Sequence, residues 1–183
     1  GRTFTGTSVE SMAVTLQGFG VDAMGINCSL GPDEILPLIK RMMEWTDIPI
    51  IVKPNAGLPD PATGTYGMDA DGFKEKMRLF SDIGIAFAGG CCGTTPEFIR
   101  GLKSLNFSGP DPWRKIRNGV CSVGRVTEFS GVRVVGERIN PTGKKLMQQA
   151  LREGNMDYIM KQALEQQEAG ADILDINVGL PGT

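Results

Sequence analysis

One pattern constrains the fold of this chain more than any other, because it recurs three times before residue 105. Each time, a run of apolar and β-branched residues ends in a polar or glycine-rich loop, and an amphipathic stretch follows. The runs lie at 21–28 (VDAMGINC), 48–55 (IPIIVKPN) and 85–92 (IAFAGGCC). Strands that alternate with helices in this way form βαβ units, and consecutive βαβ units build a parallel sheet. The fold class predicted from the residues is therefore α/β.

The stretches that follow these runs have the spacing of helices. Residues 32–34 (PDE) are typical of a first helical turn, because proline fits there and carboxylates face the positive end of the helix dipole. We expect the apolar face of this helix to consist of Ile35, Leu38, Ile39, Met42 and Met43. Similar stretches lie at 73–83 and from 95 onward, and an earlier one at 9–18 is predicted to precede the first strand.

The alternation stops at 103–133, which contains a Gly-Pro-Asp-Pro sequence and little periodicity, and we interpret this segment as a linker. A second βα unit is predicted after it. Its strand spans 132–137 (VRVVGE), its helix runs through 158–168, and Gly170 ends that helix. A second strand is predicted at 173–178 (ILDINV).

Composition excludes several classes of function. With 40% apolar and 22% charged residues among 183, the chain is expected to be globular, and its net charge of −2 predicts no nucleic-acid partner and no membrane partner. No apolar run approaches the ~20 residues needed to cross a bilayer, and the N-terminus does not resemble a signal peptide. We therefore expect a cytoplasmic protein. Because the sequence contains four cysteines and no histidine, a zinc site here must use thiolates, carboxylates or amides.

Three of the cysteines stand where predicted strands end. Cys28 closes the first strand, and Cys91 and Cys92 close the third. The carboxyl ends of parallel strands lie on one side of a sheet, so these thiols are able to converge. Three thiolates would leave the fourth corner of a tetrahedral zinc ion open, which is the pattern of a catalytic rather than a structural site. A substrate thiol bound in that corner would be held as a thiolate.

The same cysteines have two other interpretations when spacing alone is considered. They fit small buried apolar residues, since free cysteine is often buried and the pattern matches no C-x-x-C template. Cys91 and Cys92 also fit a vicinal redox pair. Cys121 lies in the linker without a partner motif and is interpreted as structural or incidental.

Two cysteine motifs, 89–96 (GGCCGTTP) and 25–32 (GINCSLGP), resemble the zinc signature of the homocysteine-binding domain in the methionine synthase family and related S-methyltransferases. The resemblance implies a (β/α)8 barrel, of which 1–104 would form the C-terminal part. It also implies that Cys28, Cys91 and Cys92 are zinc ligands with catalytic roles. The segment 52–57 (VKPNAG) is similar to the family as well. Asn55 within it is a candidate for contact with the metal or substrate, or alternatively an asparagine that caps the loop.

Beyond a linker at 105–131, two motifs in 132–183 resemble the first part of the pterin-binding barrel of the cobalamin-dependent members of this family. They are 135–143 (VGERINPTG) and 171–179 (ADILDINVG). Asp175 and Asn177 share one strand face at a period of two, offering a carboxylate and an amide to a pterin edge. The candidate substrate-binding residues are Glu137, Asn140, Asp175 and Asn177. Without the resemblance, an Asp-x-Asn motif equally fits a simple strand end.

The order of the two motif sets implies transfer of a methyl group from 5-methyltetrahydrofolate to cobalamin and then to homocysteine, with Zn²⁺ activating the homocysteine thiol. A cobalamin-binding module elsewhere in the parent protein would be a partner. Two rival interpretations stay open. In one, this chain is an incomplete, non-catalytic segment that at most binds zinc and self-associates through unpaired strand edges. In the other, it belongs to a zinc-dependent methyltransferase that uses a different methyl donor. For the chain alone we expect no methyl transfer.

Overall fold

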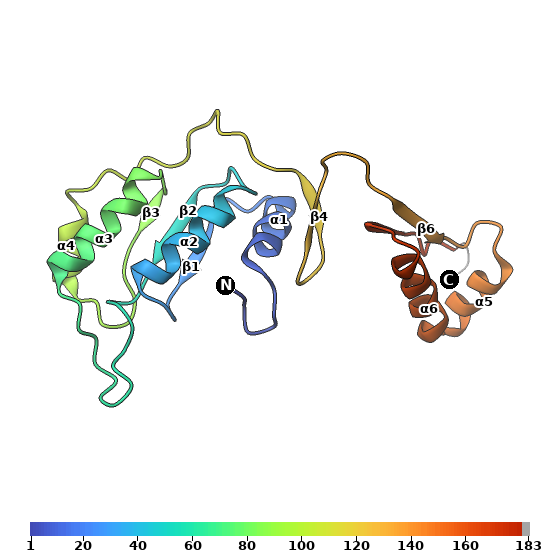
Figure 1. Cartoon of the computed structure of the whole chain (residues 1–183), viewed down its shortest axis with the longest axis horizontal. Helices are drawn as coiled ribbons and strands as arrows, with labels where there is room; N and C mark the ends of the chain where they lie inside the picture. Colours follow the sequence, from blue (N-terminus) through green and yellow to red (C-terminus); the bar gives the residue numbers. More distant parts are fainter. Residues whose placement is uncertain (181–183) are drawn as a thin grey trace. The chain divides into compact units, whose positions relative to one another are not determined.

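The computed structural model describes residues 1–180, which belong to two compact units (Figure 1). The first unit is Gly1–Val126, and the second begins at Thr127. The last residues of the predicted pterin-binding segment, 181–183, lie outside the described residues. No helix within residues 1–180 is both long enough and apolar enough to span a membrane.

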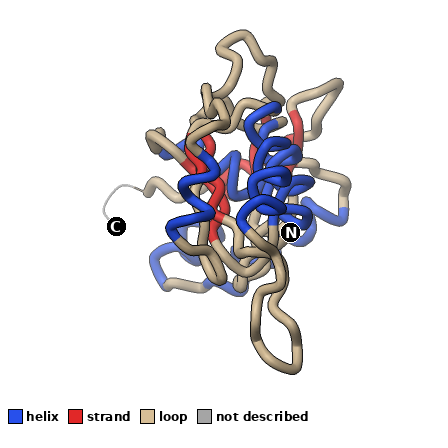
Figure 2. The backbone as a smooth tube through the Cα atoms, turned by 90° about the vertical axis from the view of Figure 1, so that its left-hand side faces the viewer, coloured by secondary structure: helices blue, strands red, loops and turns tan. Residues whose placement is uncertain are grey.

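The first unit is built around a small parallel sheet, as the alternating pattern predicted. Its elements in chain order are α1 (Val9–Phe19), β1 (Met24–Asn27), α2 (Pro32–Met43), β2 (Ile50–Lys53), α3 (Ala70–Asp82), β3 (Phe87–Ala88) and α4 (Pro96–Leu102). The strands are ordered β1-β2-β3, and both neighbouring pairs are parallel. The strands are shorter than the apolar runs, because the ends of the runs leave the ladder to form the loops that carry the cysteines. Figure 2 shows the strands beside the helices, and the loop after β2 extends well beyond them.

The core of the first unit lies between the sheet and the helices. Most of the apolar residues predicted for α2 and α3 belong to it, and Ile35, Ile39, Phe73 and Phe80 are fully buried in one cluster with Val52 of β2. Leu38, predicted on the same face of α2, is only partly buried and lies outside this cluster. Each such side chain contributes about 1.5–3 kcal/mol relative to an exposed position. Within the described residues β1 and β3 pair on one side only, so both are edge strands.

The segment expected to be a linker contains regular structure. Strands β4 (Gly119–Cys121) and β5 (Val126–Glu128) form a two-stranded sheet. The turn between them bonds to the start of α1, since the Ser8 amide donates to the Val123 carbonyl at 3.1 Å. The Thr15 hydroxyl also lies 3.2 Å from the Cys121 sulfur. Three-residue strands are too short to give an alternating pattern in sequence, which is why this hairpin was not predicted.

The second unit is a parallel strand pair covered by two helices. Its elements are β6 (Val135–Ile139), α5 (Lys145–Glu153), α6 (Met156–Glu168) and β7 (Ile173–Ile176). A small core contains Ile139, Met147 and Ile159. The sequence predicted one helix here, whereas the structure has two. The helix breaks at Gly154, which adopts a left-handed φ of 65°, and the Asn155 side chain then caps α6 by accepting from the Tyr158 amide.

Candidate metal centre

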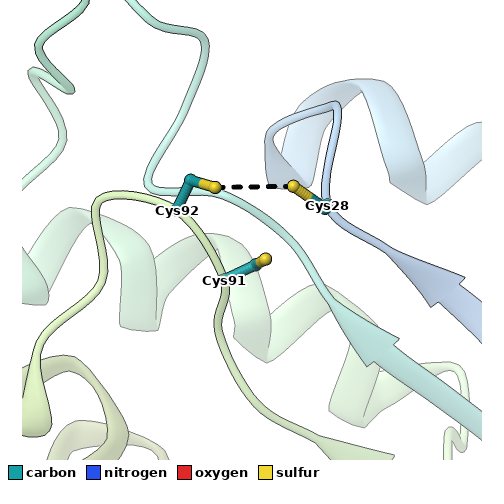
Figure 3. Close-up of side chains that lie close together, drawn as sticks. All are labelled: Cys28, Cys91 and Cys92. Atoms are coloured by element: carbon teal, nitrogen blue, oxygen red, sulfur yellow. Dashed lines mark hydrogen bonds between the residues drawn. The ribbon is translucent and has the colours of Figure 1, made fainter.

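Three thiols converge at the carboxyl ends of the sheet in the first unit (Figure 3). Cys28 follows β1 directly, and Cys91 and Cys92 lie in the loop after β3. Their sulfur atoms all lie within 4.8 Å of one another, and those of Cys28 and Cys92 are 3.5 Å apart. Cys92 is exposed and the other two are only partly buried, so these side chains are not buried residues of the hydrophobic core. All three are free thiols rather than disulfides.

The vicinal cysteines face one point because their backbone is held by the segment after β2. The Cys91 amide donates to the Pro54 carbonyl at 2.9 Å, and the Cys92 carbonyl accepts from the Ala56 amide at 2.9 Å. The Thr94 hydroxyl closes the turn by donating to the Cys91 carbonyl at 2.7 Å. Gly90 is required here, because a Cβ at this position would come within 2.5 Å of the Thr94 side chain.

Cys28 is placed by an unusual backbone conformation. Cys28 and Ser29 both have positive φ, 67° and 66°, and within the described residues they are the only non-glycine residues that do. A left-handed conformation costs a residue with a Cβ about 1–2 kcal/mol. The conformation is held by hydrogen bonds from the Cys28 amide to the Lys53 carbonyl at 3.0 Å and from the Leu30 amide to the Cys28 carbonyl at 2.8 Å. Strain of this kind concentrates at functional sites, where surrounding contacts maintain it.

The pKa values of Cys28 and Cys91 are shifted in opposite directions. The Ser29 backbone amide, together with the Cys91 and Cys92 thiols, hydrogen-bonds to the Cys28 sulfur and lowers the pKa of Cys28. The pKa of Cys91 is raised, first by its hydrogen bond to Cys28 and then by burial. Between these two cysteines, Cys28 is therefore favoured as the thiolate.

The donor set fits a zinc ion. Zn–S bonds of about 2.3 Å place the sulfurs of a tetrahedral site about 3.8 Å apart, which lies within the range of sulfur separations in the cluster. Thiolates select zinc and other soft metals over calcium or magnesium. Three such ligands would leave one tetrahedral corner for a fourth, exchangeable ligand.

Asn55 contacts the cluster through the backbone of Cys92. Its side chain is only 3% exposed, and its Oδ1 accepts a hydrogen bond from the Cys92 amide at 3.1 Å. The backbone amide of Asn55 donates to the Leu30 carbonyl at 3.0 Å. Asn55 thus links the loops that carry all three cysteines. This is a contact that a loop-capping asparagine makes, and contact of Asn55 with metal or substrate stays a prediction.

Tyr66 is a neighbour of the cluster that sequence reasoning missed. Its ring lies against Gly93, where φ is +79° and an added Cβ would approach the ring to 2.4 Å. Burial, and after it hydrogen bonding to Cys92, raises the pKa of Tyr66. The loop 58–68 that carries it is folded on itself, with a bridge between Pro59 and Tyr66. In the sequence, Tyr66 is only an aromatic residue in a Gly/Pro-rich loop. That pattern does not indicate which residues its ring contacts.

The other predicted site residues lie in the second unit: Glu137 and Asp175 within β6 and β7, and Asn140 and Asn177 directly after them. The Asn140 side-chain amide donates to the Glu137 carboxylate, so the structure brings these two into direct contact. The Asn177 amide donates to the Ile139 carbonyl at 2.9 Å, which joins the two strand ends. Glu137, Asp175 and Asn177 are exposed, and Asn140 is partly buried.

Comparisons with known proteins agree with this arrangement. Residues 1–105 match the sequence profile of the homocysteine S-methyltransferase family. The whole chain is similar to two proteins named methionine synthase. One, from Mycobacterium tuberculosis, is 30% identical over 190 residues, and the other, from Mycobacterium leprae, is 29% identical over 195 residues. Each alignment covers 100% of this chain but 16% of the relative, so the chain spans about a sixth of the length of these proteins.

Proposed function

Since the chain belongs to the homocysteine S-methyltransferase family, we propose that Cys28, Cys91 and Cys92 hold a zinc ion that binds the sulfur of homocysteine. The observation that carries this proposal is the convergence of three free thiols within 4.8 Å at adjacent strand ends. Zinc, when bound, supplies a Lewis acid that keeps a substrate thiol deprotonated at neutral pH. Cys28, Cys91 and Cys92 would hold the ion, and Asn55 and the Pro54 carbonyl keep the vicinal pair in place. The homocysteine thiolate would then attack a methyl donor, and the neutral thioether product would bind the metal less strongly.

We propose further that the second unit binds 5-methyltetrahydrofolate. Glu137, Asn140, Asp175 and Asn177 lie within or directly after two parallel strands, and ligands of parallel α/β folds bind beyond the carboxyl ends of such strands. Their carboxylates and amides match the acceptors and donors on a pterin edge.

In the complete reaction, cobalamin held by another module of the same enzyme would carry the methyl group from the folate to homocysteine. Both relatives, which match over the full length of this chain, are named methionine synthase, and this supports methionine as the product of the parent enzyme. The two units would then be parts of two (β/α) barrels, in agreement with the parallel pairing in both. A cytoplasmic location fits as well, because the site needs reduced thiols.

X-ray absorption at the zinc edge tests the homocysteine site directly. The zinc-loaded chain is measured alone, with L-homocysteine, and with L-homoserine, which replaces the thiol by a hydroxyl. We expect the sulfur coordination number to rise from about three to about four with homocysteine only. An unchanged sulfur number at saturating homocysteine would contradict the proposal.

A further inference from the structure

The two strands of the second unit do not pair regularly. Val135 and Gly136 of β6 lie opposite Ile173 and Leu174 of β7, but the next pair is Ile139 with Ile176. Between these pairs β6 advances three residues while β7 advances two. The extra residue forms a β-bulge, in which Glu137 and Arg138 together lie opposite Asp175.

The bulge leaves one backbone donor without a partner on β7, and a helix side chain accepts from it. The Arg138 amide donates to Oε1 of Gln166 in α6 at 2.7 Å, and Nε2 of Gln166 donates to the Gln162 carbonyl at 3.0 Å. Gln166 is only 8% exposed, so both ends of a buried amide are satisfied. Its close approach needs Gly136, where a Cβ would lie 2.7 Å from Oε1.

The bulge decides which face Glu137 occupies. In a regular strand Glu137 and Ile139 would share one face, because side chains alternate with a period of two. Ile139 is 1% exposed in the core beneath the helices, so a regular strand would direct Glu137 toward that core. With the extra residue, Glu137 is exposed, and its carboxylate accepts from Asn140 and pairs with Lys144 at 3.6 Å.

We propose that Gln166 is a positioning residue for the pterin site, because it holds the bulge that presents Glu137 beside Asp175 and Asn140. This inference rests on the folate-binding role proposed for the second unit. Gln166 itself is buried, and within the described residues its side chain hydrogen-bonds only to backbone groups of Arg138 and Gln162. Its effect on binding is transmitted through the backbone of Arg138 and Glu137.

Three variants of the full chain test the proposal. Gln166→Met keeps the length of the side chain but removes the acceptor. Gly136→Ala keeps glutamine at position 166, but the added Cβ would displace its side chain, because it would lie 2.7 Å from Oε1. Gln167→Met is the matched control, because Gln167 is the exposed neighbour on the same helix. We measure hydrogen exchange of the Arg138 amide, the side-chain amide resonances of Asn140, and the dissociation constant for 5-methyltetrahydrofolate by equilibrium dialysis, with unfolding followed by circular dichroism.

The expected result is that Gln166→Met and Gly136→Ala lose protection of the Arg138 amide, shift the Asn140 resonances and weaken folate binding about tenfold, while Gln167→Met changes nothing. Folded Gln166→Met with wild-type folate affinity would overturn the proposal. If the wild-type chain binds no folate, the folate role fails for this chain. The positioning inference is then decided by the other two signals: unchanged Arg138 exchange and Asn140 resonances in Gln166→Met would overturn it, and changes in both would support it.

Discussion

At the scale of single residues, the convergence of the three thiols depends on backbone contacts that orient the cysteines. Cys91 and Cys92 are adjacent, and adjacent side chains of an extended strand point to opposite faces. They converge because Pro54 and Asn55 fix the two amides on a turn. Cys28 converges with them because its backbone is held at positive φ. The cysteines were identifiable from sequence, whereas these supporting contacts depend on side-chain positions that no sequence pattern specifies.

Replacement of Asn55 by alanine tests this support. The change removes the acceptor for the Cys92 amide and leaves a partly buried donor without its partner. Zinc affinity, measured by competition with a chromophoric chelator, is expected to fall about tenfold, equivalent to about 1.4 kcal/mol. Asn106→Ala, an exposed asparagine in the same unit, serves as the control. Equal zinc affinity in Asn55→Ala and the wild type would show that Asn55 does not support the cluster.

The acidities of the thiols predict an order of modification in the metal-free, reduced chain. The pKa of Cys28 is lowered and that of Cys91 is raised. Cys28 therefore loses its proton at a lower pH than Cys91 does. Because the thiolate is the nucleophile, iodoacetamide should label Cys28 before Cys91 in a pH series analysed by peptide mass spectrometry. Both cysteines are partly buried, so exposure does not favour either. Earlier labelling of Cys91 would refute the predicted order.

At the scale of elements, the sheet that carries the cysteines depends on close approach of its strands. Gly25 in β1 pairs with Ile51 in β2, and a Cβ on Gly25 would lie 1.8 Å from the Ile51 carbonyl oxygen. Such an overlap requires the two strands to separate. The strand end that holds Cys28 would move with β1.

Gly25→Ala is therefore expected to lower the free energy of unfolding by about 2–3 kcal/mol, a typical cost of overpacking. Gly18→Ala is the matched control, because Gly18 lies in α1 with no atom within 4 Å of the added Cβ. This control should raise stability by up to about 1 kcal/mol through helix propensity. Urea unfolding measures both variants, and equal stability of the two would contradict the strand geometry.

The elements differ in how far they were predictable. Helices α1 to α4 and the parallel order of β1 to β3 follow from the hydrophobic periodicity of the sequence. Residues typical of helix starts, such as Pro32 in α2, add to this signal. The lengths of the strands were overestimated. Gly89 and Gly90 belong to the third apolar run of the sequence, but β3 ends before them, at Ala88. The break at Gly154 was missed because a glycine inside a helical pattern is often tolerated. The bulge in β6 has no signature in a single sequence, since it is created by a contact with Gln166.

At the scale of the whole molecule, the two units have separate cores. One cluster of buried apolar residues belongs to the first unit, and a smaller one around Ile139, Met147 and Ile159 belongs to the second. Residues 129–135, which follow the boundary, are exposed. The proposed zinc and folate sites therefore lie on units whose stabilities are set by different contacts.

This separation predicts that damage to one core leaves the other protected. Phe73→Ala removes a fully buried ring from the first core and should cost that unit about 3–5 kcal/mol. Hydrogen exchange measured by mass spectrometry should then accelerate in peptides from the first unit, with no change around Ile139 and Ile159. Equal loss of protection in both units would mean that they unfold as one cooperative body.

The central claim, that three converging thiols bind zinc, is tested most directly by the zinc content of the purified, reduced chain. The account predicts about one zinc per chain in the wild type. It predicts the same content in Cys121→Ser, because Cys121 lies outside the cluster and beside Thr15, and loss of the metal in Cys91→Ser. A folded, reduced wild-type chain without zinc, or a Cys91→Ser variant that keeps a full complement of the metal, would contradict it.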